Sequence, residues 1–310
     1  MWEVRSINGH PILVTGMHRS GTTWVGKTLA QAPRTYYIHE PFNLETRPLW
    51  FETPMPHMYQ YVDSKSDSHF GEEMARILNL QPRHLLTRNE VGMPNHLRLL
   101  KRSCLMSSAR LRRMRPIVKD PIAFFSAPWL DETFSMDVVV CVRHPAACVS
   151  SLARLGWYFD VNCWLDQPHL LSQIGARYAD EIARFAASRH RYDLIAAGTL
   201  VWKVIYGTLI SLIPEHPSWI IVRQEDLAES PREEFRQLFA SLGLEYYTER
   251  VAASIVAYEN IEPTNADMGP SIVLRNSRST IDEWKGVLSQ ARVEEILGSV
   301  EPEFRYFYPA

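Results

Sequence analysis

The stretch at residues 11–28, PILVTGMHRSGTTWVGKT, constrains the fold of this chain more than any other segment. Apolar or β-branched residues occupy positions 12–15 and lead into a loop that is bounded by Gly16 and Gly21. Residues compatible with a helix follow at 24–31. A strand, a glycine-bounded loop and a helix N-terminus in this order predict an anion-binding site, because loop N–H groups and the positive end of the helix dipole point at one place.

Two alignments of this loop are possible, and they imply different chemistry. Residues 21–28, GTTWVGKT, match the nucleoside-triphosphatase pattern GxxxxGK[ST] letter for letter. That pattern would need the strand to continue through 18–20 and would place Trp24 in a loop that wraps around phosphate. An alignment that begins at Gly16 agrees better with the end of the apolar strand, and it puts Arg19 in the loop as the cation. We favour this second alignment.

The composition excludes several classes of protein. The chain has 310 residues, of which 46% are hydrophobic and 22% charged, as in an ordinary globular protein with a large core. A net charge of −2 excludes a globally basic nucleic-acid binder. The four cysteines contain no CxxC pair, and Cys141 with His144 lacks a second ligand pair, so we expect reduced thiols and no metal site.

The organisation of the chain is predicted to be simple. We find no secretory leader at its start and no apolar run of transmembrane length, so we expect a cytoplasmic protein. Internal repeats and low-complexity segments are absent from the sequence. We expect a single domain over residues 1–310.

Apolar runs alternate with helical patterns and indicate a parallel sheet. The clearest strand, at 136–142, is apolar without alternation, which is typical of a parallel strand covered on both faces. Shorter candidates lie at 36–42, 116–119 and 219–223. We predict a three-layer α/β/α fold with a central parallel sheet of about four or five strands. The proline-interrupted segment at 43–115 is expected to be a partly helical insertion that covers the substrate.

The predicted strands end in charged residues or in the anion loop. These ends are Gly16, Glu40, Lys119, Arg143 and Arg223. Ligands of parallel α/β sheets bind beyond the carboxyl ends of the strands. The five ends therefore predict one polar site.

Two of these strand ends carry a resemblance to a known family. The loop at 19–24, RSGTTW, resembles the 5′-phosphosulfate loop of sulfotransferases that use 3′-phosphoadenosine 5′-phosphosulfate (PAPS). The segment at 143–145, RHP, with Ser151 eight residues after the arginine, resembles the 3′-phosphate motif of that family. The resemblance covers about 11–42 and 116–285. It implies a P-loop-like fold, PAPS as co-substrate, adenosine 3′,5′-bisphosphate as product and no metal.

The resemblance also implies which residues bind the donor. The loop and its helix would hold the 5′-phosphosulfate, with Arg19 on the sulfonate and Trp24 stacked on adenine. A fork from Arg143 and the hydroxyl of Ser151 would bind the 3′-phosphate, and a C-terminal loop before Trp284 would close over it. The expected donor-binding residues are His18, Arg19, Ser20, Gly21, Thr22, Thr23, Trp24, Arg143, Ser151, Arg278 and Ser279.

The acceptor hydroxyl must lose a proton, so a general base is expected. Where cytosolic aryl and steroid members have a histidine two residues after a lysine, this chain has Pro121 after Lys119, and proline is no base. The departure points to the tyrosylprotein, carbohydrate and bacterial branch, in which a glutamate follows the loop. Glu40 has the tyrosylprotein spacing. We expect Glu40 as the base, with Asp120 in reserve and Lys119 neutralising the sulfonate.

The acceptor and two other functions stay open at this point. A carbohydrate, a lipid-linked molecule or another small molecule could supply the hydroxyl, and aromatic residues at 42–70, at 157–159 and Trp164 could line its pocket. The basic run at 98–115 is either a solvated helix face or a patch for an anionic acceptor or a membrane surface. The alternatives are an ATP- and Mg²⁺-dependent phosphotransferase that uses 21–28 and a non-catalytic polyanion-binding module.

Overall fold

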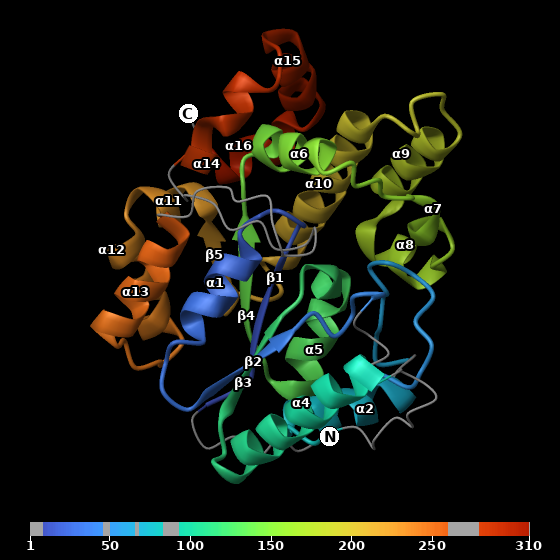
Figure 1. Cartoon of the computed structure of the whole chain (residues 1–310). Coiled ribbons are helices and arrows are strands. Elements are labelled where there is room, and N and C mark those ends of the chain that lie inside the picture. Colours follow the sequence, from blue (N-terminus) through green and yellow to red (C-terminus); the bar gives the residue numbers. More distant parts are fainter. Residues whose placement is uncertain (1–8, 46–49, 66–67, 83–92, 260–278, 310) are drawn as a thin grey trace.

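A parallel sheet forms the centre of the molecule (Figure 1). The computed structural model describes residues 9–45, 50–65, 68–82, 93–259 and 279–309. The sheet has five strands in the order β2-β3-β1-β4-β5, and each neighbouring pair is parallel. The strands are β1 (Ile12–Gly16), β2 (Thr35–His39), β3 (Arg115–Lys119), β4 (Asp137–Val142) and β5 (Ile220–Arg223). The predicted parallel α/β fold is confirmed.

The strand order explains why cationic residues flank the loop that follows β1. β1 is fully buried and lies between β3 and β4. Val14 is in register with Lys119 of β3, and Gly16 is in register with Cys141 of β4. Because all strands are parallel, the residues that follow β3 and β4 emerge on either side of the residues that follow β1.

Helices cover both faces of the sheet, as Figure 1 shows. Ile12 and Val14 of β1 pack in one cluster with apolar side chains of α1, α12 and α13, whereas Leu13 points into a second cluster that includes α5 and α10. This alternation follows from the two-residue period of a strand. These helices are α1 (Thr22–Leu29), α5 (Ala127–Phe134), α10 (Leu194–Leu212), α12 (Pro231–Ser241) and α13 (Thr248–Glu259).

The remaining elements lie around this core. Figure 1 shows α7 (Asn162–Leu165), α8 (Pro168–Ile174) and α9 (Ala176–Ala186) together at one side, and α14 (Ser279–Asp282), α15 (Gln290–Ser299) and α16 (Glu301–Phe307) beyond α6 (Pro145–Arg154). Three further short elements are η2 (Pro121–Ser126), α11 (Gln224–Glu229) and η3 (Glu283–Gly286).

In the part of the segment at 43–115 that the structure describes there are two helices, α2 (Ser68–Leu78) and α4 (Met93–Leu111). Two arginines of its basic run do not face solvent. Arg102 lies over the ring of Trp50, 3.1 Å from its centroid. Arg115 opens β3, is 2% exposed and pairs with Asp137. The run is therefore less of a surface patch than its sequence indicates.

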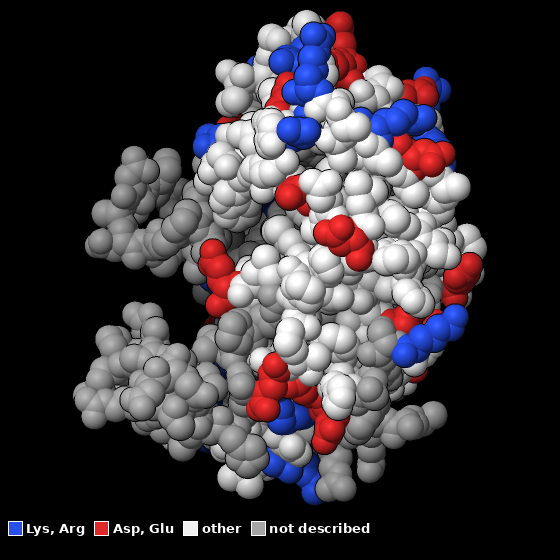
Figure 2. All heavy atoms as spheres, turned by 90° about the vertical axis from the view of Figure 1, so that its right-hand side faces the viewer, with Lys and Arg blue, Asp and Glu red and all other residues white. Residues whose placement is uncertain are grey.

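Charges of both signs are mixed on the face that Figure 2 presents, the side where α7, α8 and α9 lie. Lysine and arginine gather mostly towards the upper part of this view, with acidic side chains beside them. Uncharged side chains occupy much of the middle. No single-sign patch stands out among the residues coloured there, which gives a polyanion no obvious docking place on this side.

The helix α10 corrects the expectation that no apolar run reaches transmembrane length. It has 19 residues with a mean hydropathy of 1.5, enough by length and composition to cross a membrane. About two thirds of that window, 67%, is buried inside the protein. Its packing against α6 and α16 is that of a core helix.

Candidate active site

The loop after β1 has a backbone shape that only particular residues allow. Gly16 has φ 135°, and a Cβ at this position would lie 2.4 Å from the carbonyl oxygen of Cys141. Arg19 adopts φ 70°. The buried hydroxyl of Ser20 donates to the carbonyl of Met17 at 2.7 Å, so it holds the turn closed from inside. The loop is thus preformed, and the fixed bond of Ser20 is a structural one.

The N-terminus of α1 is arranged to receive an anion. Gly21 is its N-cap, with φ 94° and no side-chain capping bond, and the first turn contains no acidic residue. Thr22 is buried and Thr23 is half-buried at the same helix start. Backbone N–H groups of a first turn that no side chain caps are satisfied by water or by a ligand.

The triphosphatase alignment does not agree with the structure. Gly26 and Lys27 lie inside α1 rather than in the loop. A Cβ on Gly26 would come 3.0 Å from Cβ and Cγ of Lys119, so this glycine lets the helix pack closely against β3. Burial and the charge of Lys119 lower the pKa of Lys27. Gly26 therefore serves helix packing, and Lys27 lies in the last turn of α1, away from the helix start.

The two cationic motifs meet at Arg19. Its Nε donates to Oγ of Ser151 on α6 at 3.0 Å. Its carbonyl oxygen accepts a hydrogen bond from Nη1 of Arg143 at 2.9 Å. Arg143 is 8% and Ser151 5% exposed. Residues that are more than 120 positions apart in the chain thus form one cationic centre around the loop.

Glu40 and Lys119 form an ion pair beside this centre. The side chain of Lys119 is 1% exposed and that of Glu40 14% exposed. Oε2 of Glu40 also accepts from Nδ2 of Asn43 at 2.6 Å. Burial opposes ionisation of Glu40, but the charges of Lys119 and His39 and these hydrogen bonds outweigh it and lower its pKa. Glu40 is therefore an ionised carboxylate at neutral pH.

Asp120 is placed quite differently from Glu40. It is fully buried, and its two oxygens accept backbone N–H groups of Ile122 at 3.0 Å and Phe42 at 2.6 Å. Burial, with the nearby charge of Glu40, raises the pKa of Asp120 to about 7. This carboxyl caps η2 and fastens the chain after β2, which is a structural role.

Comparison with known proteins gives these features a family. Residues 11–249 match the sequence model of the Sulfotransferase family. The chain belongs to that family.

Solved structures with this fold are distant in sequence. The sulfotransferase domain from the Synechococcus PCC 7002 olefin synthase is 16% identical, with a TM-score of 0.50 over 100% of this chain and 99% of that one. The sulfotransferase domain from the curacin biosynthetic pathway has 14% identity, a TM-score of 0.47 and coverage of 96% and 98%. Sulfotransferase STF9 from Mycobacterium avium has 13% identity, a TM-score of 0.44 and coverage of 98% and 78%. No curated protein sequence matches the chain.

The C-terminal part of this sulfotransferase packs next to the second cationic motif. The ring of His144, directly after Arg143, stacks on Trp284 with centroids 4.7 Å apart and planes at 9°. Phe304 contacts the same imidazole edge-on at 5.2 Å. Ser279 begins α14, which contacts α6, whereas Arg278 lies outside the described residues. The described residues from Ser279 onwards thus pack near Arg143, and closure over a 3′-phosphate stays a prediction.

Two residues that border the start of α1, Trp24 and Gln224, are buried in this sulfotransferase. Trp24 is 5% exposed and packs edge-to-face on Phe235, with ring centroids 5.2 Å apart. Gln224 is 5% exposed, and its Cγ would lie 3.1 Å from a Cβ on Gly21. Both residues border the helix start, and stacking of Trp24 on adenine stays a prediction.

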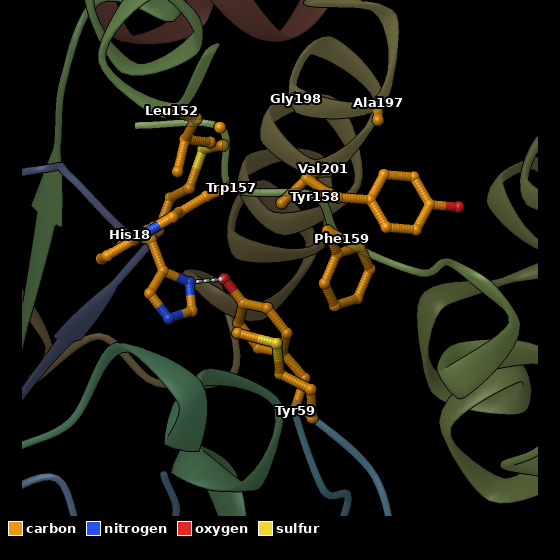
Figure 3. A pocket seen from close by; sticks show the side chains of 12 residues that line it. His18, Tyr59, Leu152, Trp157, Tyr158, Phe159, Ala197, Gly198 and Val201 are labelled. Carbon is orange, nitrogen blue, oxygen red and sulfur yellow. Dashed lines mark hydrogen bonds between the residues drawn. The ribbon is translucent and has the colours of Figure 1, made fainter. Parts of the chain in front are cut away.

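A cavity of about 250 Å³ lies on the other side of the loop (Figure 3). The sequence pointed to its aromatic wall at 157–159 and to the aromatic stretch at 42–70 that supplies Tyr59. The wall formed by α6 and α10 was not predicted. Its one hint in the sequence is Gly198, a glycine inside an apolar helix. Trp164 is fully buried in the core and is not among the lining residues. The lining residues are Met17, His18, Met58, Tyr59, Leu152, Gly156, Trp157, Tyr158, Phe159, Ala197, Gly198 and Val201.

Proposed function

We propose that this enzyme transfers the sulfonate of PAPS to an acceptor hydroxyl, with adenosine 3′,5′-bisphosphate as the second product. The meeting of Arg19 with Arg143 and Ser151 carries this proposal. PAPS has a phosphosulfate at one end of a nucleoside and a separate phosphate at the other, so its protein needs two anion sites. The loop and the Arg143–Ser151 pair supply both.

Each anion group has its own set of donors in this proposal. Backbone N–H groups of Arg19 and of residues 21–23, with the hydroxyls of Thr22 and Thr23, hold the 5′-phosphate at the positive end of α1, whereas the N–H of Ser20 donates to the carbonyl of Met17. The guanidinium of Arg143 and the hydroxyl of Ser151 hold the 3′-phosphate, and Arg278 with Ser279 completes that site. Arg19 stands between the two sets.

The transfer step assigns one role to each of three side chains. The acceptor oxygen forms a bond to sulfur as the bond from sulfur to the bridging oxygen breaks, and the electron pair of that bond leaves with the 5′-phosphate. Arg19 and Lys119 stabilise the charge that grows there. The acceptor proton passes to Glu40, which its ion pair with Lys119 keeps ionised. Asp120 is the weaker candidate, because both of its oxygens bind backbone.

The alternative functions have less support. A phosphotransferase would need Gly26 and Lys27 in the loop, and both lie in α1. A polyanion-binding module would need the whole basic run at the surface, but Arg102 stacks on Trp50 and Arg115 is buried. Assignment to the tyrosylprotein, carbohydrate and bacterial branch stays a prediction, as does the single domain with its insertion at 43–115.

Thermal unfolding with three ligands tests the proposed donor. A ligand at a hundred times its dissociation constant adds about 2.7 kcal/mol to the free energy of unfolding. We expect adenosine 3′,5′-bisphosphate to raise the melting temperature of the wild type clearly more than that of Arg143→Ala. Arg112→Ala, which removes an exposed arginine, is the matched control and should respond as the wild type does. Stabilisation by ATP with Mg²⁺ or by heparin alone would overturn the proposal.

A further inference from the structure

The cavity opens beside the loop at 16–21. Most of the residues that line it have no role in the proposed donor binding. Met17 and His18 of the loop form part of its lining. Trp157 connects it to the cationic centre, because Cζ of Arg19 lies 5.8 Å from the centroid of this ring. A molecule in the cavity therefore sits within one side chain of the residue proposed to hold the sulfonate.

The walls are apolar or aromatic over most of their surface. Figure 3 shows the rings of Tyr59, Trp157 and Phe159 around the space, with Val201 of α10 at the back. Aspartate, glutamate, lysine and arginine are absent from the described residues that line it. An ionised ligand would lose its hydration there without a partner, and several sugar hydroxyls would find too few hydrogen-bonding groups.

One polar pair interrupts this apolar lining. Nδ1 of His18 and the hydroxyl of Tyr59 are 2.8 Å apart, and Figure 3 draws this bond at the wall nearest the loop. Burial lowers the pKa of His18 to about 4, with Lys119 and Arg19 adding to the effect and Glu40 opposing it. A neutral imidazole that uses Nδ1 in this way has Nε2 left for one further hydrogen bond. The His18–Tyr59 pair thus offers a polar position beside the apolar cavity, where one hydroxyl group can bind.

Glu40 interacts electrostatically with this pair. Its charge acts on the protonation of His18, as does the charge of Lys119. A hydroxyl that is held at His18 therefore lies in the same electrostatic neighbourhood as the proposed base and the proposed sulfonate-binding residues. The cavity volume, below the roughly 300 to 1,000 Å³ of sites for drug-sized ligands, limits the body of such a molecule to one or two rings.

We propose that this cavity is the acceptor site and that the acceptor is a compact, uncharged phenol or alcohol with an apolar body, whose hydroxyl hydrogen-bonds to the His18–Tyr59 pair. This inference rests on the proposed function and names the acceptor class for it. It favours apolar alcohols and phenols over the carbohydrates and anionic acceptors that the sequence left open.

Direct binding of small probes tests the inference without the donor. In isothermal titration of the protein, we expect 2-naphthol to bind at least about tenfold more tightly than 4-hydroxybenzoate, which adds a charge, and than N-acetylglucosamine, which adds polar hydroxyls. Equal or tighter binding of either polar probe would overturn the proposed acceptor class.

Two cavity variants locate the binding. Val201→Phe fills the space from α10, and we expect it to weaken 2-naphthol binding at least tenfold. Leu111→Phe adds the same ring at a side chain that is 85% exposed and should bind like the wild type. Phe159→Ala enlarges the cavity from the opposite wall, so a four-ring steroid alcohol should gain affinity relative to 2-naphthol. Folded variants that leave both affinities unchanged would place 2-naphthol elsewhere and overturn the inference. If Val201→Phe does not fold, Phe159→Ala decides.

The inference and the proposed function fail in different ways. If the bisphosphate stabilises the protein and 2-naphthol does not bind, the acceptor inference is wrong and the proposed donor stands. If 2-naphthol binds and the bisphosphate does not, the proposed function is wrong, and the cavity loses its role as an acceptor site. Sulfation of 2-naphthol by the wild type with PAPS, reduced in Val201→Phe, supports both.

Discussion

The two sides of the loop at 16–21 differ in almost every physical property. On the side proposed to bind the donor, hereafter the donor side, Arg19, Arg143 and Ser151 form a cationic centre tied together by hydrogen bonds. On the other side, aromatic and aliphatic side chains enclose a cavity with one polar pair, His18 and Tyr59. The donor carries several negative charges and needs fixed cations, whereas a molecule recognised by shape needs a dry wall. In the function proposed here, one short loop therefore separates electrostatic recognition of the donor from apolar recognition of the acceptor.

Removal of Arg19 is expected to give the largest effect, because this residue belongs to the donor side and borders the cavity. Arg19→Ala takes away the charge next to the leaving oxygen and the bond to Ser151, so we expect kcat to fall by about 10²- to 10³-fold. Steady-state kinetics with PAPS measure this. The exposed Arg112→Ala variant should keep the wild-type rate. A kcat within threefold of wild type in Arg19→Ala would contradict the proposed role of Arg19 at the leaving oxygen.

Substitution of Glu40 should affect catalysis, whereas substitution of Asp120 should affect the stability of the fold. Glu40→Gln keeps the shape but cannot take a proton, so we expect kcat to fall by about 10²-fold or more with bisphosphate affinity nearly unchanged. Asp120→Asn should instead lower the free energy of unfolding, by about 1 to 3 kcal/mol, because an amide cannot accept both backbone N–H groups. Kinetics and urea unfolding on both variants distinguish these outcomes. Full activity in Glu40→Gln would remove it from the mechanism.

Arg143→Ala probes the donor side alone. We expect the dissociation constant of adenosine 3′,5′-bisphosphate to rise by about tenfold to a hundredfold, as for loss of a charge-assisted hydrogen bond. Binding of 2-naphthol should not change. Equilibrium titrations with both ligands check this, and an unchanged affinity for the bisphosphate would contradict the role of Arg143.

Acid should lower the free energy of unfolding through one histidine on each side of the loop, and we expect this effect to be smaller than those above. Burial lowers the pKa of His18 beside the cavity, and of His144 beside Arg143, to about 4 from the ordinary 6.5. As the pH falls below 6.5, the unfolded chain binds protons that the folded protein does not. The free energy of unfolding should then drop by about 1 to 2 kcal/mol per imidazole by pH 4. Above pH 6.5 these two imidazoles should not change it.

Urea unfolding at pH 7.5 and 5.0 measures this loss. His144→Asn and His18→Asn should each show a smaller difference between the two pH values than the wild type. An equal or larger difference in both variants would show that other groups cause the acid sensitivity.

Most of the sheet could be predicted from the sequence, because parallel strands are buried on both faces and are continuously apolar. β4 is the clearest case: the run at 136–142 contains all of Asp137–Val142. The strand ends followed from the same signal, and the structure places Lys119 and Arg143 on either side of β1. The hydrogen bond from Arg19 to Ser151 was not predicted, because sequence gives order and not distance; the family resemblance assigned the two residues to different anionic groups of the donor.

The cavity was the least predictable part. Its walls from α6 and α10 consist of Leu152, Gly198 and Val201, residues that are also ordinary in a helix packed in a core. Whether such side chains fill a core or leave a space depends on the spacing between helices, which a linear pattern does not contain. The same ambiguity led Trp164 to be grouped with the pocket, although it is fully buried.

The central claim is that donor and acceptor occupy opposite sides of one loop, and simultaneous binding tests it most directly. The affinity of 2-naphthol is measured by isothermal titration with and without saturating adenosine 3′,5′-bisphosphate. We predict that the two ligands bind together and that each dissociation constant changes by less than about threefold, because the two sites share no occupied volume. Mutual exclusion of the two ligands would contradict the account.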